Sequence, residues 1–231
     1  LCNLFNWQVR HDALQVADIF LDALGYGESE APERTAGEAD RPRIELEEGQ
    51  LAAWAGLYFD AKRVALREFK FLDGKLKLGE LSLRPLSADR FVFEESPDVQ
   101  VLFKAASDQR PAQVQIISST TAYSYRRVEP ADPASVELAD YEGQYHCPEL
   151  NVYWNLMLDG DRLIVRRQRY QDTELTAVFA DGFRDDWSPV VGHPRSYFIL
   201  FDRGADGGII GFRVSDDRMR NLRFFRQTLD R

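Results

Sequence analysis

The chain contains few of the residues that mark disulfide-rich, metal-binding or nucleic-acid-binding proteins. Its 231 residues include two cysteines and three histidines. Cys2 and Cys147 are too few for a disulfide framework, and they lack the close spacing of zinc ligands. Lys and Arg number 29 against 38 Asp and Glu, which gives a formal net charge of −9. This acidic balance argues against a nucleic-acid partner, because such a partner needs a clustered basic face.

Long apolar runs are also missing from the chain. No stretch approaches the roughly 18 apolar residues of a membrane-spanning helix, so we expect no membrane span. Hydrophobic residues make up 44% of the chain and aromatic residues 12%. This composition is typical of a globular protein and not of a disordered or fibrous one. The length fits one large domain or two small ones.

Patterns of known catalytic centres are absent from the sequence. No Ser has a Lys three residues later, and Gly-x-Ser-x-Gly does not occur. Residues 153–155 fit Tyr-x-Asn, but they lie in an alternating stretch that predicts a strand, and we interpret the match as coincidence. The histidines, His11, His146 and His193, have no spacing that supports a Ser-His-Asp triad. We therefore predict no catalytic residue and no cofactor.

One short cluster of metal-binding residue types does occur. His146, Cys147 and Glu149 could together ligate a metal ion. A cluster at a strand end without a function is the preferred interpretation, so no metal site is predicted. Arginines alternate with apolar residues over 165–170 and 218–226. Although such stretches can bind single strands or anions, we expect the arginines on the solvent face and the apolar residues inside.

The N-terminal 43 residues differ from the rest of the chain. Residues 11–24 repeat apolar side chains at steps of three and four, which predicts an amphipathic helix that must dock on another element. Gly25 and Gly27 end this helix. Residues 25–43 are rich in Glu, Ala, Gly and Pro, which predicts a flexible linker. The apolar positions of the helix are Leu14, Val16, Ala17, Phe20, Leu21 and Leu24.

From Ile44 onward the pattern changes to a period of two, in short runs that alternate apolar with polar residues. Short alternating runs end at Asp73-Gly74 and at Asp159-Gly160, which predicts antiparallel strands joined by tight turns. An internal repeat is superimposed on this pattern. Residues 50–58 read QLAAWAGLY and residues 137–145 read ELADYEGQY.

Four further matches follow the repeat in the same order. Two prolines within 129–134 mark the boundary between the copies as a short stiff linker. The matches are Leu72-Asp73-Gly74 with Leu158-Asp159-Gly160, Asp89-Arg90-Phe91 with Asp181-Gly182-Phe183, Phe103 with Phe201, and Tyr125-Arg126 with Phe225-Arg226.

Each copy holds about eight alternating segments, the number of strands that closes a small up-and-down barrel. The sequence therefore predicts an all-β chain of two consecutive antiparallel barrels, preceded by one N-terminal α-helix. Within the repeat, Gly56 and Gly143 allow a short helical turn to pack against the barrel end. Trp54 and Tyr141 would plug that end, and Tyr58 and Tyr145 would begin the first strands. We interpret all six residues as structural.

The chain resembles the C-terminal part of the serine β-lactamase and penicillin-binding-protein-like hydrolases, which include class C β-lactamases, esterases and D-aminopeptidases. Residues 1–4 and the segment Ala13–Leu21 look like the last strand and C-terminal helix of the hydrolase domain. The repeats, the Leu-Asp-Gly turns and the stretch Arg218–Phe224 are similar to the lipocalin-like domains appended to those hydrolases.

This resemblance implies four parts and a non-catalytic role. Residues 1–24 would be the remnant of a hydrolase domain that the sequence does not contain, 25–43 a linker, 44–129 the first barrel and 130–231 the second. The catalytic residues of the family would lie in the absent domain, which would be the principal partner. The chain itself would then be an accessory region that shapes or limits access to the active site of that domain.

One loop is a candidate for such a role. The stretch 184–195 is the largest insertion of the second copy, and long loops often carry function. Trp187, His193 and Arg195 are the residues that would reach toward the active site of the partner domain. The alternative function is a stand-alone module that binds a small apolar or peptide ligand, since barrels of this size can hold one.

Overall fold

The computed structural model describes residues 44–227 except 108–110, 120, 133–134, 169, 186–196 and 216–218. All described residues belong to one compact unit, Pro42–Arg231. The predicted helix over 11–24, the predicted linker over 25–43 and the loop residues Trp187, His193 and Arg195 lie outside the described residues.

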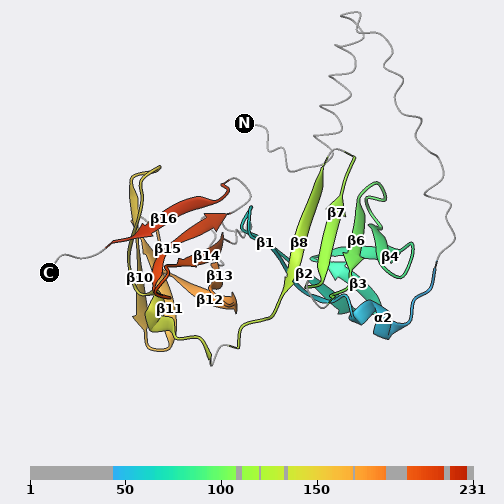
Figure 1. Cartoon of the computed structure of the whole chain (residues 1–231), viewed down its shortest axis with the longest axis horizontal. Helices are drawn as coiled ribbons and strands as arrows, with labels where there is room; N and C mark the ends of the chain where they lie inside the picture. The colour runs from blue at the N-terminus through green and yellow to red at the C-terminus, as the bar shows by residue number, and fades with distance from the viewer. Residues whose placement is uncertain are drawn as a thin grey trace, which may run out of the picture. The chain divides into compact units, whose positions relative to one another are not determined.

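The first copy of the repeat forms a closed barrel of eight antiparallel strands (Figure 1). Each strand pairs with the next along the chain, and the first strand closes the ring by pairing with the eighth. A five-residue helix, α2 (Glu48–Ala52), precedes the barrel. Its strands are β1 (Gly56–Asp60), β2 (Ala65–Leu72), β3 (Lys75–Leu78), β4 (Leu81–Pro85), β5 (Arg90–Phe93), β6 (Gln100–Lys104), β7 (Gln113–Ile117) and β8 (Ala122–Val128).

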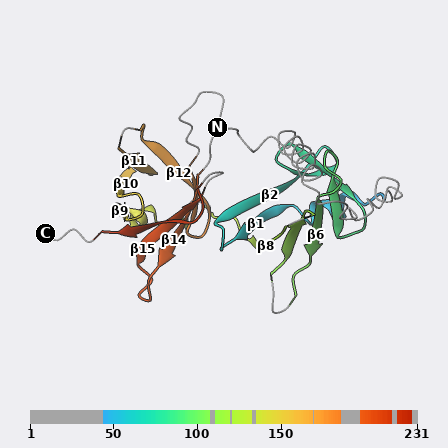
Figure 2. The same cartoon turned by 90° about the horizontal axis from the view of Figure 1, so that it is seen from above.

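The second copy repeats this topology (Figures 1 and 2). A 3₁₀ turn, η2 (Leu138–Tyr141), replaces the short helix, and the ring closes between β9 and β16. The predicted fold class, two consecutive up-and-down antiparallel barrels, is therefore confirmed. The strands are β9 (Gly143–Cys147), β10 (Val152–Asp159), β11 (Arg162–Arg167), β12 (Thr173–Phe179), β13 (Gly182–Asp185), β14 (Tyr197–Arg203), β15 (Ile209–Ser215) and β16 (Leu222–Arg226).

The turn sequences explain why neighbouring strands pair as hairpins. Leu72 pairs with Lys75, so Asp73 and Gly74 form a two-residue loop with φ of 53° and 73°. Positive φ at both loop positions is the backbone of a type I′ turn, whose twist matches that of the flanking strands. The matched turn of the second copy also has a left-handed glycine, Gly160, at φ 64°.

Most of the predicted repeat correspondences share a structural position. Asp89 and Asp181 each precede the fifth strand of their barrel, and each accepts a backbone hydrogen bond, from Phe103 and Phe201 respectively, at 2.8 Å. The correspondence of Tyr125-Arg126 with Phe225-Arg226 is wrong by one residue. Tyr58 pairs with Arg127 in the first barrel, and Tyr145 pairs with Arg226 in the second. The matching pairs are therefore Tyr125 with Phe224, both buried, and Arg127 with Arg226.

These two arginines tie the last strand of each barrel to the turn before the first strand. Arg127 donates to the carbonyl oxygens of Ala53 and Ala55 at 3.1 and 3.0 Å. Arg226 makes the equivalent bonds to the carbonyl oxygens of Asp140, at 3.2 Å, and Glu142. Each arginine thus helps to close its own ring, through bonds between residues that lie 74 apart in the sequence of the first barrel and 86 apart in that of the second.

The repeat glycines leave room for these arginines. Gly56 and Gly143 both have φ of 147°, a backbone conformation that favours glycine. A Cβ at Gly56 would lie 3.2 Å from the Nε atom of Arg127, and one at Gly143 would lie 3.1 Å from the Nε atom of Arg226. Glycine is therefore favoured at both positions for two reasons, backbone conformation and close approach.

Aromatic side chains fill the interiors of both barrels. In the first barrel Trp54 stacks on Phe103, with ring centroids 5.0 Å apart. In the second barrel the ring centroid of Tyr141 lies 4.7 Å from those of Phe183 and Phe201. In each barrel these rings pack at the end that holds the first residues of the repeat copy. The core of the second barrel consists of Tyr141, Tyr145, Cys147, Trp154, Leu156, Leu163, Val165, Leu175, Phe183, Ile199, Phe201, Ile209, Phe212, Val214, Leu222 and Phe224.

A smaller apolar cluster contains residues of both barrels within the compact unit. Phe59 of β1 lies 4.8 Å from Phe179 and 5.3 Å from Phe198, measured between ring centroids. Two hydrogen bonds flank these rings. Arg213 donates to the carbonyl oxygen of Ala61 at 3.0 Å, and the Ser215 hydroxyl donates to the carbonyl oxygen of Arg63 at 2.9 Å.

Replacing the repeat glycine should destabilise the barrel. We expect Gly143→Ala to lower the free energy of unfolding by about 1–3 kcal/mol, because alanine would be strained at φ 147° and would press against Arg226. The matched control is Gly49→Ala, since a Cβ there meets nothing within 4 Å. The control should change stability by no more than about 0.5 kcal/mol. Urea unfolding monitored by circular dichroism measures both, and equal midpoints would contradict the explanation.

Candidate functional site

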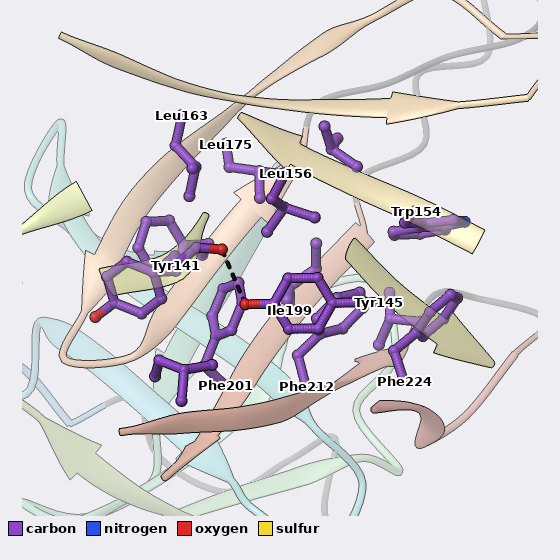
Figure 3. Packing of buried hydrophobic residues seen from close by; sticks show 14 of the residues in the cluster. Tyr141, Tyr145, Trp154, Leu156, Leu163, Leu175, Ile199, Phe201, Phe212 and Phe224 are labelled. Carbon is purple, nitrogen blue, oxygen red and sulfur yellow. Dashed lines mark hydrogen bonds between the residues drawn. The ribbon is translucent and has the colours of Figure 1, made fainter. Parts of the chain in front are cut away.

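The six repeat residues singled out from the sequence form matching hydrogen-bonded units. The Tyr58 hydroxyl donates to the carbonyl oxygen of Trp54 at 3.1 Å, and the Tyr145 hydroxyl donates to that of Tyr141 at 2.9 Å (Figure 3). The indole Nε1 of Trp54 donates in turn to the carbonyl oxygen of Ala88 at 2.9 Å. These bonds hold the barrel end together, and the six residues do not converge on a shared opening.

The second barrel replaces the tryptophan with a charged network. The Tyr141 hydroxyl donates to the Asp181 carboxylate at 2.8 Å. Arg203 binds the same carboxylate at 2.8–3.0 Å and also donates to the Tyr141 hydroxyl at 3.3 Å. Burial, followed by the hydrogen bond to Asp181, raises the pKa of Tyr141 to about 12. A phenol with such a pKa is a poor general base near neutral pH, so this network is structural.

The cluster of His146, Cys147 and Glu149 is not assembled for metal binding. His146 stacks on Tyr153 outside the barrel, with ring centroids 4.4 Å apart, whereas Cys147 belongs to the buried core. Successive residues of a strand point to opposite faces, which explains this separation. Among the residues that the structure describes, no group of three His, Cys, Asp or Glu side chains could hold a metal ion.

The Tyr-x-Asn match at 153–155 likewise lies on two faces of β10. Tyr153 is exposed, and Trp154 is buried against Phe224 at 4.6 Å. The Asn155 side chain accepts a hydrogen bond from Gln144 at 3.1 Å. No two of these side chains meet at a common point, which agrees with the interpretation of the match as coincidence.

A buried ion pair lies inside the second barrel. Arg167 donates to the Asp185 carboxylate and to the Thr173 hydroxyl. The side chains of Arg167 and Asp185 are 5% and 0% exposed. The expectation that the arginines of 165–170 face the solvent is therefore wrong for Arg167. It holds for Arg166, which is exposed and pairs with Asp172 at 2.7 Å.

The surroundings of Arg167 explain how a charge is tolerated there. The guanidinium lies 5.1 Å from the ring centroid of Trp154 and 5.8 Å from that of Tyr197. Such cation–π contacts partly replace the lost hydration. Alternation from Leu163 and Val165 places Arg167 on the inner face of β11, and the pairing of Arg167 with Trp154 agrees with this. The expectation of an exposed position followed from the charge of the arginine.

A groove of about 630 Å³ lies on the described part of the chain. Its walls come from β1, β2, the connecting segment at Pro130-Ala131, and β12, with Arg184 of β13 at one side. The Ala131 amide donates to the carbonyl oxygen of Val178 at 2.8 Å, so the connecting segment is tied to β12. Val178 lies at an irregularity in the pairing of β12 with β13. The sequence did not predict this groove, because its walls are up to 129 residues apart (184 − 55).

Comparisons with known proteins add no family to this description. The chain matches no model of a known protein family and no curated protein. In the part of the chain that the structure describes, no helix is long and apolar enough to cross a membrane.

Breaking the buried ion pair should cost far more than breaking the exposed one. We expect Asp185→Asn to lower the free energy of unfolding by about 3–5 kcal/mol, because it leaves the Arg167 charge buried without its counter-charge. Asp172→Asn is the matched control, since it removes the carboxylate that faces Arg166 at the surface. Urea denaturation of both variants measures the difference. A control as destabilised as Asp185→Asn would show that burial is not the cause.

The buried tyrosines should make the fold sensitive to alkaline pH. Burial raises the pKa of Tyr141 and of Tyr145 to about 12, above the usual 10.0. The folded state thus holds these protons more tightly than the unfolded state. The stability gained is complete below pH about 10 and is lost as the pH rises from about 10 to 12. Absorbance at 295 nm follows tyrosine ionisation and should show tyrosines that titrate late. The Tyr145→Phe variant should have one late-titrating tyrosine fewer than the unchanged protein. Identical titrations of the variant and the unchanged protein above pH 11 would refute this assignment.

Proposed function

We propose that the chain is a non-catalytic accessory region of a serine β-lactamase-like hydrolase, in which it shapes or limits access to the active site. The observation that carries this proposal is the packing of the two barrels. Buried aromatic side chains pack inside both barrels with ring centroids about 5 Å apart, for example Trp54 with Phe103 and Tyr141 with Phe201. Barrels packed in this way would meet a partner through their outer surfaces and loops, as an accessory domain does.

The sequence features of the resemblance support the same role. The tandem of barrels follows a segment that looks like the end of a hydrolase domain. The insertion over 184–195 supplies Trp187, His193 and Arg195 as the residues proposed to reach the active site of the partner domain. In this proposal the catalytic serine, its base and its lysine belong to the hydrolase domain.

Labelling with a fluorescent penicillin tests where the nucleophile lies. We expect the 231-residue chain to gain no covalent label, because the reactive serine belongs to the hydrolase domain of the parent protein. A labelled band that survives denaturation would contradict the proposal. In the second arm, removal of residues 44–231 from the parent protein should change kcat/KM for bulky substrates relative to small ones. An unchanged ratio would show that the barrels do not control access.

A second candidate function, a module that binds a small apolar or peptide ligand, is favoured by the groove beside Pro130-Ala131. Its volume of about 630 Å³ falls within the range of small-molecule sites, about 300–1,000 Å³. The groove lies outside both barrel interiors, so this function does not require an empty barrel.

A further inference from the structure

We infer that the groove binds an apolar molecule that carries one carboxylate group. The inference rests on the second candidate function and gives it a site and a ligand class. The groove is defined by β1, β2, Pro130-Ala131, β12 and Arg184, as described above.

The apolar side chains in the walls of the groove indicate that the ligand has an apolar part. Leu57, Phe71, Leu72 and Val178 line it, and Leu72 is nearly half exposed, at 48%. An exposed leucine gains free energy when a ligand covers it, by roughly 25 cal/mol for each Å² of apolar surface removed from water. A molecule with a short aliphatic portion would cover these side chains together.

The charged side chains of the groove indicate that the ligand carries a carboxylate group. Three charged side chains line it, namely Glu68, Lys70 and Arg184. Glu68 and Lys70 pair with each other at 3.4 Å. Arg184 is half-buried and has no acidic partner among the residues that the structure describes. Because arginine binds carboxylates in a bidentate geometry, a single carboxylate would complete the site.

The charge of the groove is opposite in sign to that of the whole chain. The chain has a net charge of −9, yet the groove has a net charge of +1 from two cations and one anion. Several surface arginines of the second barrel pair with a carboxylate, as in Arg162 with Asp159, Arg166 with Asp172 and Arg213 with Asp202. Arg184 instead lies beside the apolar walls of the groove.

The groove is also held in shape without a ligand. The hydrogen bond between the Ala131 amide and Val178 fixes one wall against β12. The opposite wall is β2, which is paired along its length with β1 and β3. A preformed site loses little free energy to ordering when the ligand binds.

Isothermal titration calorimetry and ¹⁵N–¹H spectra of the full 231-residue chain test this inference. The probes are octanoate and 1-octanol, and the tripeptide acetyl-Leu-Leu-Val with a free or an amidated C-terminus. We expect each carboxylate to bind about tenfold more tightly than its uncharged counterpart, because the ion pair is partly desolvated. If octanoate binds more tightly than the peptide acid, the source is an acyl chain; the reverse order indicates a peptide C-terminus.

Three variants locate the site. Arg184→Gln should weaken carboxylate binding about tenfold and leave 1-octanol binding unchanged. Arg223→Gln is the matched control, since Arg223 is an exposed arginine of β16 outside the groove. Thr176→Trp places a large side chain in the groove at an exposed position and should abolish binding of all four probes. The ¹⁵N–¹H spectrum of each variant verifies that it is folded.

The failure of the inference can be told apart from that of the binding function. Octanoate binding that survives both Arg184→Gln and Thr176→Trp would overturn the groove as the site and leave a binding module with another site. Equal affinities for octanoate and 1-octanol would overturn the carboxylate. Absence of binding for all four probes at millimolar concentration would overturn the inference together with the second candidate function.

Discussion

The approach of an arginine of the last strand to the glycine that begins the first strand is the constraint on which each barrel depends. A sheet of eight strands has two edges, and closure removes both only if the first and last strands meet in one register. Arg127 and Arg226 fix that register, because each guanidinium reaches two carbonyl oxygens of the preceding turn. The absence of a side chain at Gly56 and Gly143 makes room for this approach.

The plug of each barrel depends on the same turn. The turn that the arginine holds carries Trp54 in one barrel and Tyr141 in the other, so both rings are delivered to the barrel end. The two copies then differ in the hydrogen bonds of the ring that closes the barrel end. The indole N–H of Trp54 donates one bond, to the carbonyl oxygen of Ala88. The Tyr141 hydroxyl donates to Asp181 and accepts from Arg203. The barrels are thus equivalent in topology and distinct in the polar chemistry of one end.

The sequence was sufficient to predict the barrels because their signals are local. Alternation specifies the strands, Asp73-Gly74 specifies a turn, and the repeat itself specifies two copies of one fold. It failed at two strand positions. Phe224 and Phe225 are both phenylalanines, and the repeat was matched on Phe225 although Phe224 is the buried one. Arg167 was expected in solvent because it is charged, although alternation places it inside. A shift of one residue exchanges the two faces of a strand, and only cross-strand pairing resolves it.

The groove could not be predicted from sequence for a different reason. Its walls meet only after both copies have folded, and Arg184 belongs to a stretch that the sequence analysis treated as a loop. Hydrophobic patterns also predict what is buried, whereas a binding groove requires apolar residues that stay partly exposed, such as Leu72. The candidate residues Trp187, His193 and Arg195 lie outside the described residues, and their role stays a proposal.

The distance along the chain between the partners of each closing contact has a consequence for folding kinetics. Every other strand pair of a barrel joins strands that follow one another along the chain, whereas the closing arginines span 74 and 86 residues. The chain entropy lost in forming such a contact grows with the length of the loop it closes. Hairpins within each copy therefore lose less chain entropy than closure of the ring, and we expect closure to come last. Until that step, each copy is an open sheet whose two free edges can pair with another chain.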